Sequence, residues 1–128
     1  MPRQKILLVD DEEHILRSTR MLLDVLGYDC VTLKDASRVI EVAAREHPDL
    51  ILQDIRMPAL NVPALVERLK QTPETSTIPV ALFSASPELS EEAWQAHAGG
   101  YLTKPFKEEE LVKLLNAAIP KRAASRRP

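Results

Sequence analysis

The sequence predicts an α/β fold, an open and mostly parallel sheet covered by helices on both faces. Three observations predict it. Short, wholly apolar runs, typical of strands buried on both faces, recur along the 128 residues. A segment with apolar residues at helical spacing follows each run. Five such strand–helix pairs alternate strictly, which favours parallel strands joined by right-handed helical crossovers.

Apolar or β-branched residue types mark the expected strands. These are residues 6–9, 28–33, 50–52, 79–83 and 101–103. The runs at 6–9, 50–52 and 79–83 contain no charged residue, as expected of strands buried on both faces. Each of these runs leads directly to a polar segment, so the strand ends can be placed from the sequence.

Helical periodicity and capping residues mark the expected helices. These are residues 12–26, 36–46, 63–71, 90–96 and a last helix with Leu111, Leu114, Leu115 and Ala118 on one face. Acidic residues fill the first turn of the first helix, where the helix dipole favours them, and Gly27 follows its end. Asp35 and Ser90 are suited to be N-caps, and Pro63 suits a first turn.

The charged residues are unevenly distributed along the chain. There are 17 basic and 19 acidic residues, but residues 121–128 hold four basic residues and no acidic one, so the rest carries a net charge of −6. We therefore expect one domain over residues 1–119, a basic tail or linker stub over residues 120–128, and no direct nucleic-acid binding by the domain. One cysteine and no apolar stretch of membrane-spanning length predict a soluble, cytoplasmic protein.

Polar side chains gather where the expected central strands end. In an open parallel sheet the ligand site lies at the carboxyl ends of the strands. The chain places Asp10, Asp11, Asp54, Ser84 and Lys104 there. Three converging carboxylates repel one another, and Mg²⁺, which takes oxygen ligands, would relieve that repulsion. With a lysine and a hydroxyl, they supply what phosphoryl transfer to an aspartate needs.

Four segments of the chain, in order, resemble the receiver domain of bacterial two-component response regulators. They are residues 7–12, residues 49–58, the pair Ser84–Ala85 and residues 101–106. The resemblance extends over about Lys5 to Ile119. It implies a flavodoxin-like sheet with the strand order 2-1-3-4-5. It also implies a phosphoacceptor signalling domain rather than an enzyme, one that supports its own Mg²⁺-dependent phosphorylation and dephosphorylation.

The resemblance implies a role for each residue of the site. Asp54 matches the phosphoacceptor, which takes the phosphoryl group from a phosphohistidine of a sensor histidine kinase or phosphotransfer protein. Asp10 and Asp11 match the acidic pair that holds Mg²⁺, Asp11 directly and Asp10 through water, and Asp54 shares that ion. The main-chain carbonyl of Arg56 matches a further metal ligand. Lys104 matches the lysine that binds a phosphoryl oxygen.

The resemblance also implies a switch. Ser84 matches the hydroxyl that bonds the phosphoryl group, and Tyr101 matches the aromatic residue that turns inward on activation. The face made by the fourth helix, the fifth strand and the last helix would then change, and a downstream protein or a second copy of the chain would bind it. Lys104–Pro105 matches a peptide bond that is cis in the family.

The chain departs from the family's pattern at three places. Where the family usually has an acid or asparagine followed shortly by glycine, this chain has Asn61, Val62 and Pro63. Valine does not readily take a positive φ, so we expect the loop over the site to follow an altered path. His97 replaces a cap glycine, a conformation that histidine tolerates better than branched residues do. Arg56 places a long cation at the mouth of the site.

Two other functions compete with a phosphorylated receiver. One is a pseudo-receiver that folds but is never phosphorylated and acts as a scaffold. All the family's reactive positions are filled here, which argues against it. The other is a phosphatase of the haloacid dehalogenase type, which also uses Mg²⁺, aspartate, a hydroxyl and lysine. Those enzymes have Asp-x-Asp after the first strand, whereas this chain has Asp10–Asp11–Glu12 there and a separate Asp54 after the third.

Overall fold

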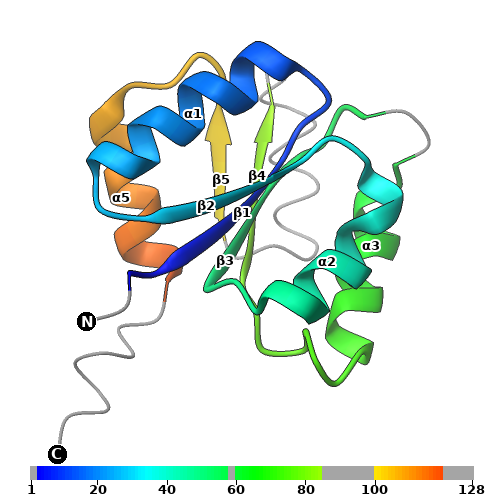
Figure 1. Ribbon diagram of the computed structural model, residues 1–128. Helices are drawn as coiled ribbons and strands as arrows, with labels where there is room; N and C mark the ends of the chain where they lie inside the picture. The colour runs from blue at the N-terminus through cyan, green and yellow to red at the C-terminus, as the bar shows by residue number, and fades with distance from the viewer. Residues whose placement is uncertain (1–2, 58–59, 85–99, 120–128) are drawn as a thin grey trace, which may run out of the picture.

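The structure, a computed structural model, describes residues 3–57, 60–84 and 100–119. Five strands form one parallel sheet in the order β2-β1-β3-β4-β5 (Figure 1). The strands are β1 (Lys5–Val9), β2 (Asp29–Leu33), β3 (Leu50–Asp54), β4 (Val80–Ser84) and β5 (Gly100–Thr103). This order and the parallel pairing confirm the predicted fold.

Helices cover both faces of the sheet. They are α1 (Glu13–Val25), the 3₁₀ turn η1 (Ala36–Arg38), α2 (Val39–Glu46), α3 (Val62–Gln71) and α5 (Glu108–Ala118). α1 and α5 lie on one face, and α2 and α3 lie on the other (Figure 1). The helix predicted over residues 90–96 lies outside the described residues, as do His97 and the tail. None of the helices within the described ranges is long and apolar enough to cross a membrane.

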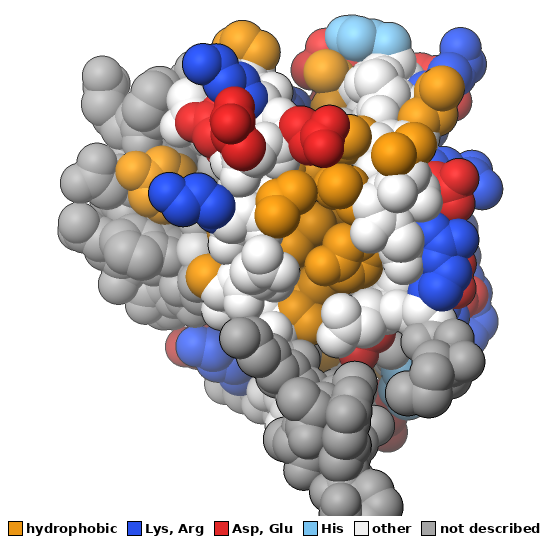
Figure 2. All heavy atoms as spheres, turned by 90° about the vertical axis from the view of Figure 1, so that its left-hand side faces the viewer, with side chains coloured by type: hydrophobic (Ala, Val, Ile, Leu, Met, Phe, Trp, Pro, Cys, Tyr) orange, Lys and Arg blue, Asp and Glu red, His pale blue; other side chains and the backbone are white. Residues whose placement is uncertain are grey.

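Two apolar clusters fill the space between the sheet and its helices, because successive side chains of a strand point to opposite faces. On β1, Leu7 and Val9 join the cluster beneath α2 and α3, whereas Ile6 and Leu8 join the cluster beneath α1 and α5. All four side chains are fully buried, as their uninterrupted apolar run predicts. Figure 2 views the side where α1 and α5 lie and shows a band of hydrophobic side chains flanked by charged ones.

The segment predicted as one helix over residues 36–46 begins instead as the 3₁₀ turn η1. The Asp35 carboxylate accepts hydrogen bonds from the backbone N–H and the hydroxyl of Ser37, at 2.9 and 2.6 Å. Asp35 is therefore an N-cap as predicted, but its two bonds to a residue only two positions on favour the tighter turn. The segment ends at His47, whose φ of 50° is left-handed.

The third strand is longer than its apolar run. The prediction ended it at Leu52, but β3 continues through Gln53 to Asp54. Both extra residues stay in register with β4, Gln53 opposite Leu82 and Asp54 opposite Phe83. Backbone pairing with the neighbouring strand therefore outweighs the polar character of these two side chains, and it carries both of them into the buried layer.

Candidate functional site

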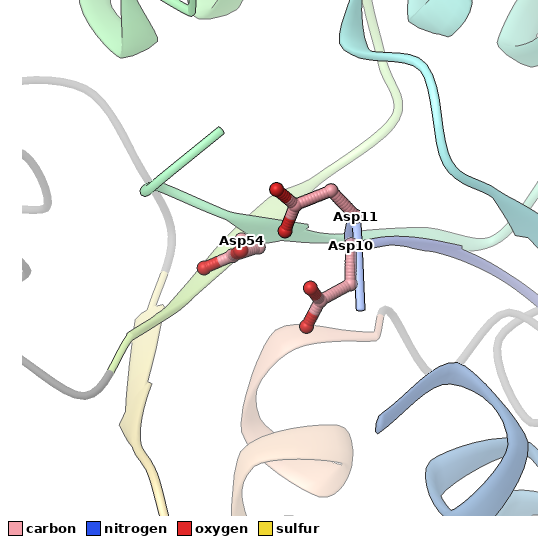
Figure 3. A group of neighbouring side chains, drawn as sticks. All are labelled: Asp10, Asp11 and Asp54. Carbon is pink, nitrogen blue, oxygen red and sulfur yellow. The ribbon is translucent and has the colours of Figure 1, made fainter. Parts of the chain in front are cut away.

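Three carboxylates meet at the carboxyl edge of the sheet (Figure 3). Asp10 and Asp11 directly follow β1, and Asp54 is the last residue of the adjacent strand β3. One carboxylate oxygen from each lies within 4.8 Å of the others. Asp10 is fully buried and Asp54 is 2% exposed, whereas Asp11 is exposed. The structure thus brings together all three acidic residues that the sequence placed at this edge.

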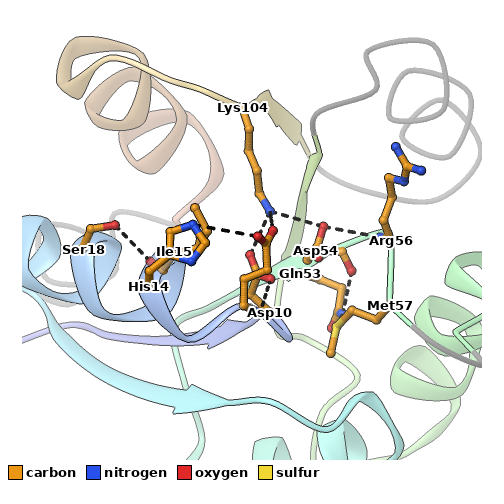
Figure 4. A network of polar contacts seen from close by, with 10 residues as sticks. Asp10, His14, Ile15, Ser18, Gln53, Asp54, Arg56, Met57 and Lys104 are labelled. Atoms are coloured by element: carbon orange, nitrogen blue, oxygen red, sulfur yellow. Dashed lines mark hydrogen bonds and ion pairs between the residues drawn. The ribbon is translucent and has the colours of Figure 1, made fainter.

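Lys104 reaches the carboxylates from the loop after β5 (Figure 4). Its Nζ lies 2.8 Å from Asp10 Oδ2 and 3.6 Å from Asp54 Oδ1, and its side chain is 13% exposed. Nζ also lies 4.6 Å from the centre of the Phe83 ring. The peptide bond between Lys104 and Pro105 is cis, as predicted. One positively charged ammonium therefore lies beside two buried carboxylates, and its single charge does not neutralise both of them.

The environment of Asp54 makes its carboxylate unusually basic. Burial and then the neighbouring Asp10 charge raise the pKa of Asp54 to about 6, against the opposing effects of Lys104 and of a hydrogen bond from the backbone. That bond is donated by the Arg56 N–H to Asp54 Oδ1, at 3.3 Å. Asp54 is therefore ionised at neutral pH, yet it holds a proton more tightly than an ordinary aspartate does.

The start of α1 fixes the position of Asp10. Asp10 Oδ1 accepts a hydrogen bond from the backbone N–H of Glu12 at 3.0 Å, in the turn that leads into the helix. The other oxygen, Oδ2, faces Lys104. Three carboxylates and one lysine leave an excess of negative charge in a small volume. Because hard divalent cations prefer several carboxylate oxygens, this donor set suits an ion such as Mg²⁺.

The other residues predicted for the site are placed as follows. Ser84 is the last residue of β4, opposite Thr103, and its side chain lies outside the described part of the structure. Tyr101 is half-buried and packs against the cluster on the α2 and α3 side. The Arg56 side chain is exposed, consistent with a place at the mouth of the site.

The loop after Asp54 leads into α3 through an N-cap. Asn61 Oδ1 accepts a hydrogen bond from the Ala64 N–H at 2.9 Å, with Asn61 in an extended conformation. Val62 is the first residue of α3 and is 7% exposed. Valine is therefore accommodated by starting the helix and packing into the core, without a positive φ.

Gln53 is a buried polar residue beside the site that the sequence reasoning missed. It immediately precedes Asp54, has no exposed surface, and its side-chain Nε2 donates to the Asp54 carbonyl oxygen at 2.9 Å. The signal that would have singled it out is a glutamine directly continuing the apolar run 50–52. Such a residue needs a hydrogen-bond partner if the strand buries it.

Comparison with known protein families gives one match that spans the fold. The model of the response regulator receiver domain matches residues 6–116. Among curated proteins, Protein PilH of Pseudomonas aeruginosa is 32% identical over 117 residues, which cover 90% of this chain and 97% of PilH. The DNA-binding transcriptional regulator NtrC of Escherichia coli is 35% identical over 121 residues, 93% of this chain but 25% of NtrC.

Other relatives differ in length from this chain. The chain spans about half, 49%, of the probable transcriptional regulator ycf27 of Porphyridium aerugineum, at 31% identity and with 93% of the chain covered. Among solved structures, the chemotaxis response regulator CheY4 of Vibrio cholerae matches with a TM-score of 0.78 and 28% identity, over 90% of this chain and 98% of CheY4. The receiver domain of sensor histidine kinase PA1611 from P. aeruginosa, with magnesium in its active site cleft, matches with a TM-score of 0.81 and 28% identity, over 90% of this chain and 96% of that domain.

Proposed function

Because this chain belongs to the response regulator receiver domain family, we propose that it is a signalling module switched by phosphorylation of Asp54. The donor is the phosphohistidine of a sensor histidine kinase or of a phosphotransfer protein. The observation that carries the proposal is the buried Asp54 carboxylate, grouped with Asp10 and Asp11 and 3.6 Å from the Lys104 ammonium. A nucleophilic carboxylate, its acidic neighbours and a fixed cation are the parts that phosphoryl transfer needs.

In the transfer step the Asp54 carboxylate attacks the phosphorus atom. A phosphorus–oxygen bond to Asp54 forms as the phosphorus–nitrogen bond to the donor histidine breaks, and the histidine ring leaves with the electron pair. The raised pKa of Asp54, about 6, supports this role, because a more basic carboxylate is a better nucleophile while still ionised at pH 7.

The acidic cluster has the composition of a divalent-cation site. Asp10, Asp11, Asp54 and the Arg56 main-chain carbonyl are the groups that would hold Mg²⁺. When bound, the ion would place positive charge against the phosphoryl oxygens. Lys104, now shared between Asp10 and Asp54, would bind another phosphoryl oxygen. A second cation is useful there because the phosphoryl group adds nearly two negative charges.

The response to phosphorylation would pass through β4 and β5. The Ser84 hydroxyl would move toward the phosphoryl group, and Tyr101 would turn inward beside it. Ser84 ends β4 opposite Thr103 of β5, and Thr103 is two residues after Tyr101 on the same strand. Ser84 and Tyr101 are therefore diagonal neighbours on adjacent strands. The face expected from the helix predicted over residues 90–96, together with β5 and α5, would then bind a downstream protein or a second copy of the chain. The phosphoryl group need only favour one arrangement by a few kcal/mol.

Incubation with acetyl phosphate and Mg²⁺ tests the proposal. Intact-protein mass spectrometry should find one added phosphoryl group on the wild type and none on Asp54→Asn. Asp24→Asn is a matched control, because Asp24 is an exposed carboxylate near the end of α1, whereas Asp10 and Asp11 precede its start; it should be phosphorylated like the wild type. An unmodified wild type would favour the unphosphorylated scaffold. A modified Asp54→Asn would mean that another residue is the acceptor.

A further inference from the structure

Gln53 places a carboxamide in an otherwise apolar layer of the protein. Along the sheet it is in register with Val9 of β1 and Leu82 of β4, which both belong to the apolar cluster beneath α2 and α3. Its side chain therefore lies on the face of β3 opposite the Asp54 carboxylate. Burying a carboxamide costs free energy unless its polar atoms form hydrogen bonds, so this residue requires an explanation.

The carboxamide nitrogen contacts both ends of the turn that follows Asp54 (Figure 4). Nε2 donates to the Asp54 carbonyl oxygen at 2.9 Å and lies 3.4 Å from Met57 Sδ. Because a carbonyl can only accept, the nitrogen and not the oxygen must face Asp54. One NH₂ group thus contacts the residues on either side of 55–56, the segment that contains the Arg56 carbonyl.

The other half of the carboxamide is unsatisfied. Gln53 Oε1 is buried and has no hydrogen-bond partner in the described structure. An unpaired buried carbonyl destabilises the folded state, and an apolar side chain of similar volume would avoid that penalty. The oxygen therefore adds no hydrogen bond to the fold, and the contribution of glutamine at this position comes through its nitrogen.

We propose that Gln53 is a positioning residue for the cation site. It holds the backbone from Asp54 to Met57 in the conformation from which the Arg56 carbonyl serves as a ligand, a role that rests on the proposed Mg²⁺ site. The hydrogen bond from the Arg56 N–H to Asp54 Oδ1 uses the carboxylate that phosphorylation changes. The Gln53 bond, on the far face of the sheet, uses only the Asp54 main chain and is independent of that change.

The test is the variant Gln53→Met, which keeps the volume and removes the donor. Titration calorimetry with Mg²⁺ alone should give a dissociation constant about fivefold higher than that of the wild type, equivalent to the roughly 1 kcal/mol net value of one hydrogen bond. The melting temperature of the metal-free variant should stay close to that of the wild type, because removal of the unpaired Oε1 offsets loss of the Nε2 bond to the Asp54 carbonyl. Leu82→Met, one strand away in the same row, is the matched control and should bind Mg²⁺ as the wild type does.

The outcomes separate the two proposals. A wild type that does not bind Mg²⁺ overturns the cation site and the role of Gln53 together. A wild type that binds, with Gln53→Met binding equally well, overturns the role of Gln53 alone. Equal losses of affinity in Gln53→Met and Leu82→Met would assign the effect to core packing and also overturn it. If Gln53→Met does not fold, NMR of the wild type decides: slow-exchanging Gln53 side-chain amide protons that shift with Mg²⁺ support the proposal, and fast exchange with solvent overturns it.

Discussion

At the amino end of the sheet, Arg3 lies 3.2 Å from Asp24 and Lys5 lies 3.2 Å from Glu46, whereas at the carboxyl end Lys104 lies 2.8 Å from Asp10. The distances are similar, but the surroundings are not. The Arg3 and Asp24 side chains are 40% and 72% exposed, and Lys104 and Asp10 are 13% and 0% exposed. Water screens the first group of charges and leaves the second group to interact strongly.

The two ends also shift carboxylate pKa values in opposite directions. At the amino end, hydrogen bonds from Lys5 and then Arg45 lower the pKa of Glu46. At the carboxyl end, burial and the charge of Asp10 raise the pKa of Asp54. The amino end has its charges paired and helps to hold the fold together, while the carboxyl end keeps an excess of carboxylates. The difference teaches that an excess of buried carboxylates over cations, rather than ion pairing as such, distinguishes the functional end of the sheet.

The largest expected effect breaks the buried pair. Lys104→Met should lower the free energy of unfolding by on the order of 3 kcal/mol, because it leaves Asp10 buried and unpaired. Lys5→Met, its counterpart at the amino end, should cost less than about 1 kcal/mol, since its pair with Glu46 is partly exposed. Urea denaturation at pH 7 measures both. Equal losses for the two variants would contradict the contrast between the ends.

The next effect concerns the raised pKa of Asp54. Between about pH 4 and pH 6 the folded state binds more protons than the unfolded state, because the pKa rises from 3.8 to about 6 on folding. The stability of the metal-free protein should therefore fall as pH rises through this window. Asp54→Asn should lack that fall and exceed the wild type by on the order of 2 kcal/mol at pH 7. Melting curves in chelator across this range check it, and parallel curves would refute it.

A smaller effect is expected from Mg²⁺ itself. At ten times its dissociation constant, the ion should stabilise the wild type by about 1.4 kcal/mol. Asp11→Asn should lose most of that gain, because Asp11 is the exposed carboxylate of the cluster. Asp24→Asn, at the other end, should keep it. Thermal melts with and without Mg²⁺ compare the three proteins, and a gain retained in Asp11→Asn would remove Asp11 from the site.

The smallest effect is expected at the amino end. Arg3 donates to the main-chain carbonyls of Asp24, Gly27 and Tyr28, at 2.8 to 3.1 Å, and so caps the end of α1. Arg3→Met should cost about 0.5–1 kcal/mol of stability. Phosphorylation and Mg²⁺ affinity should not change. A measurable loss of either would mean that the two ends are coupled through α1.

The sequence predicted the parts of the site that depend on where strands stop. Asp10 and Asp54 follow apolar runs, and parallel pairing of β1 and β3 brings them to the same edge. Lys104 follows the last strand in the sequence, and in the structure its ammonium lies at the same edge, beside Asp10 and Asp54. These residues were predictable because a buried strand and its end leave a clear pattern in the sequence.

Other features depend on side-chain geometry that no pattern records. The glutamine that continues the apolar run 50–52 marks Gln53 as a residue that needs a partner if buried, but the sequence does not show that the partner is the Asp54 carbonyl. The turn at Ala36–Arg38 results from two hydrogen bonds between Asp35 and Ser37, a local competition that an N-cap prediction does not resolve. The inward movement of Tyr101 remains a prediction, because it concerns a second, phosphorylated state.

The contact between Lys104 and Asp10 joins residues that are 94 positions apart in the sequence. As a ribosome releases the chain, the three aspartates emerge long before the lysine, and their closest counter-charge is absent during that interval. The contact between Lys104 and Asp10 therefore cannot form until the chain has been made through β5 and residue 104. A nascent or truncated chain that ends before residue 104 has the three carboxylates but lacks the buried cation beside them.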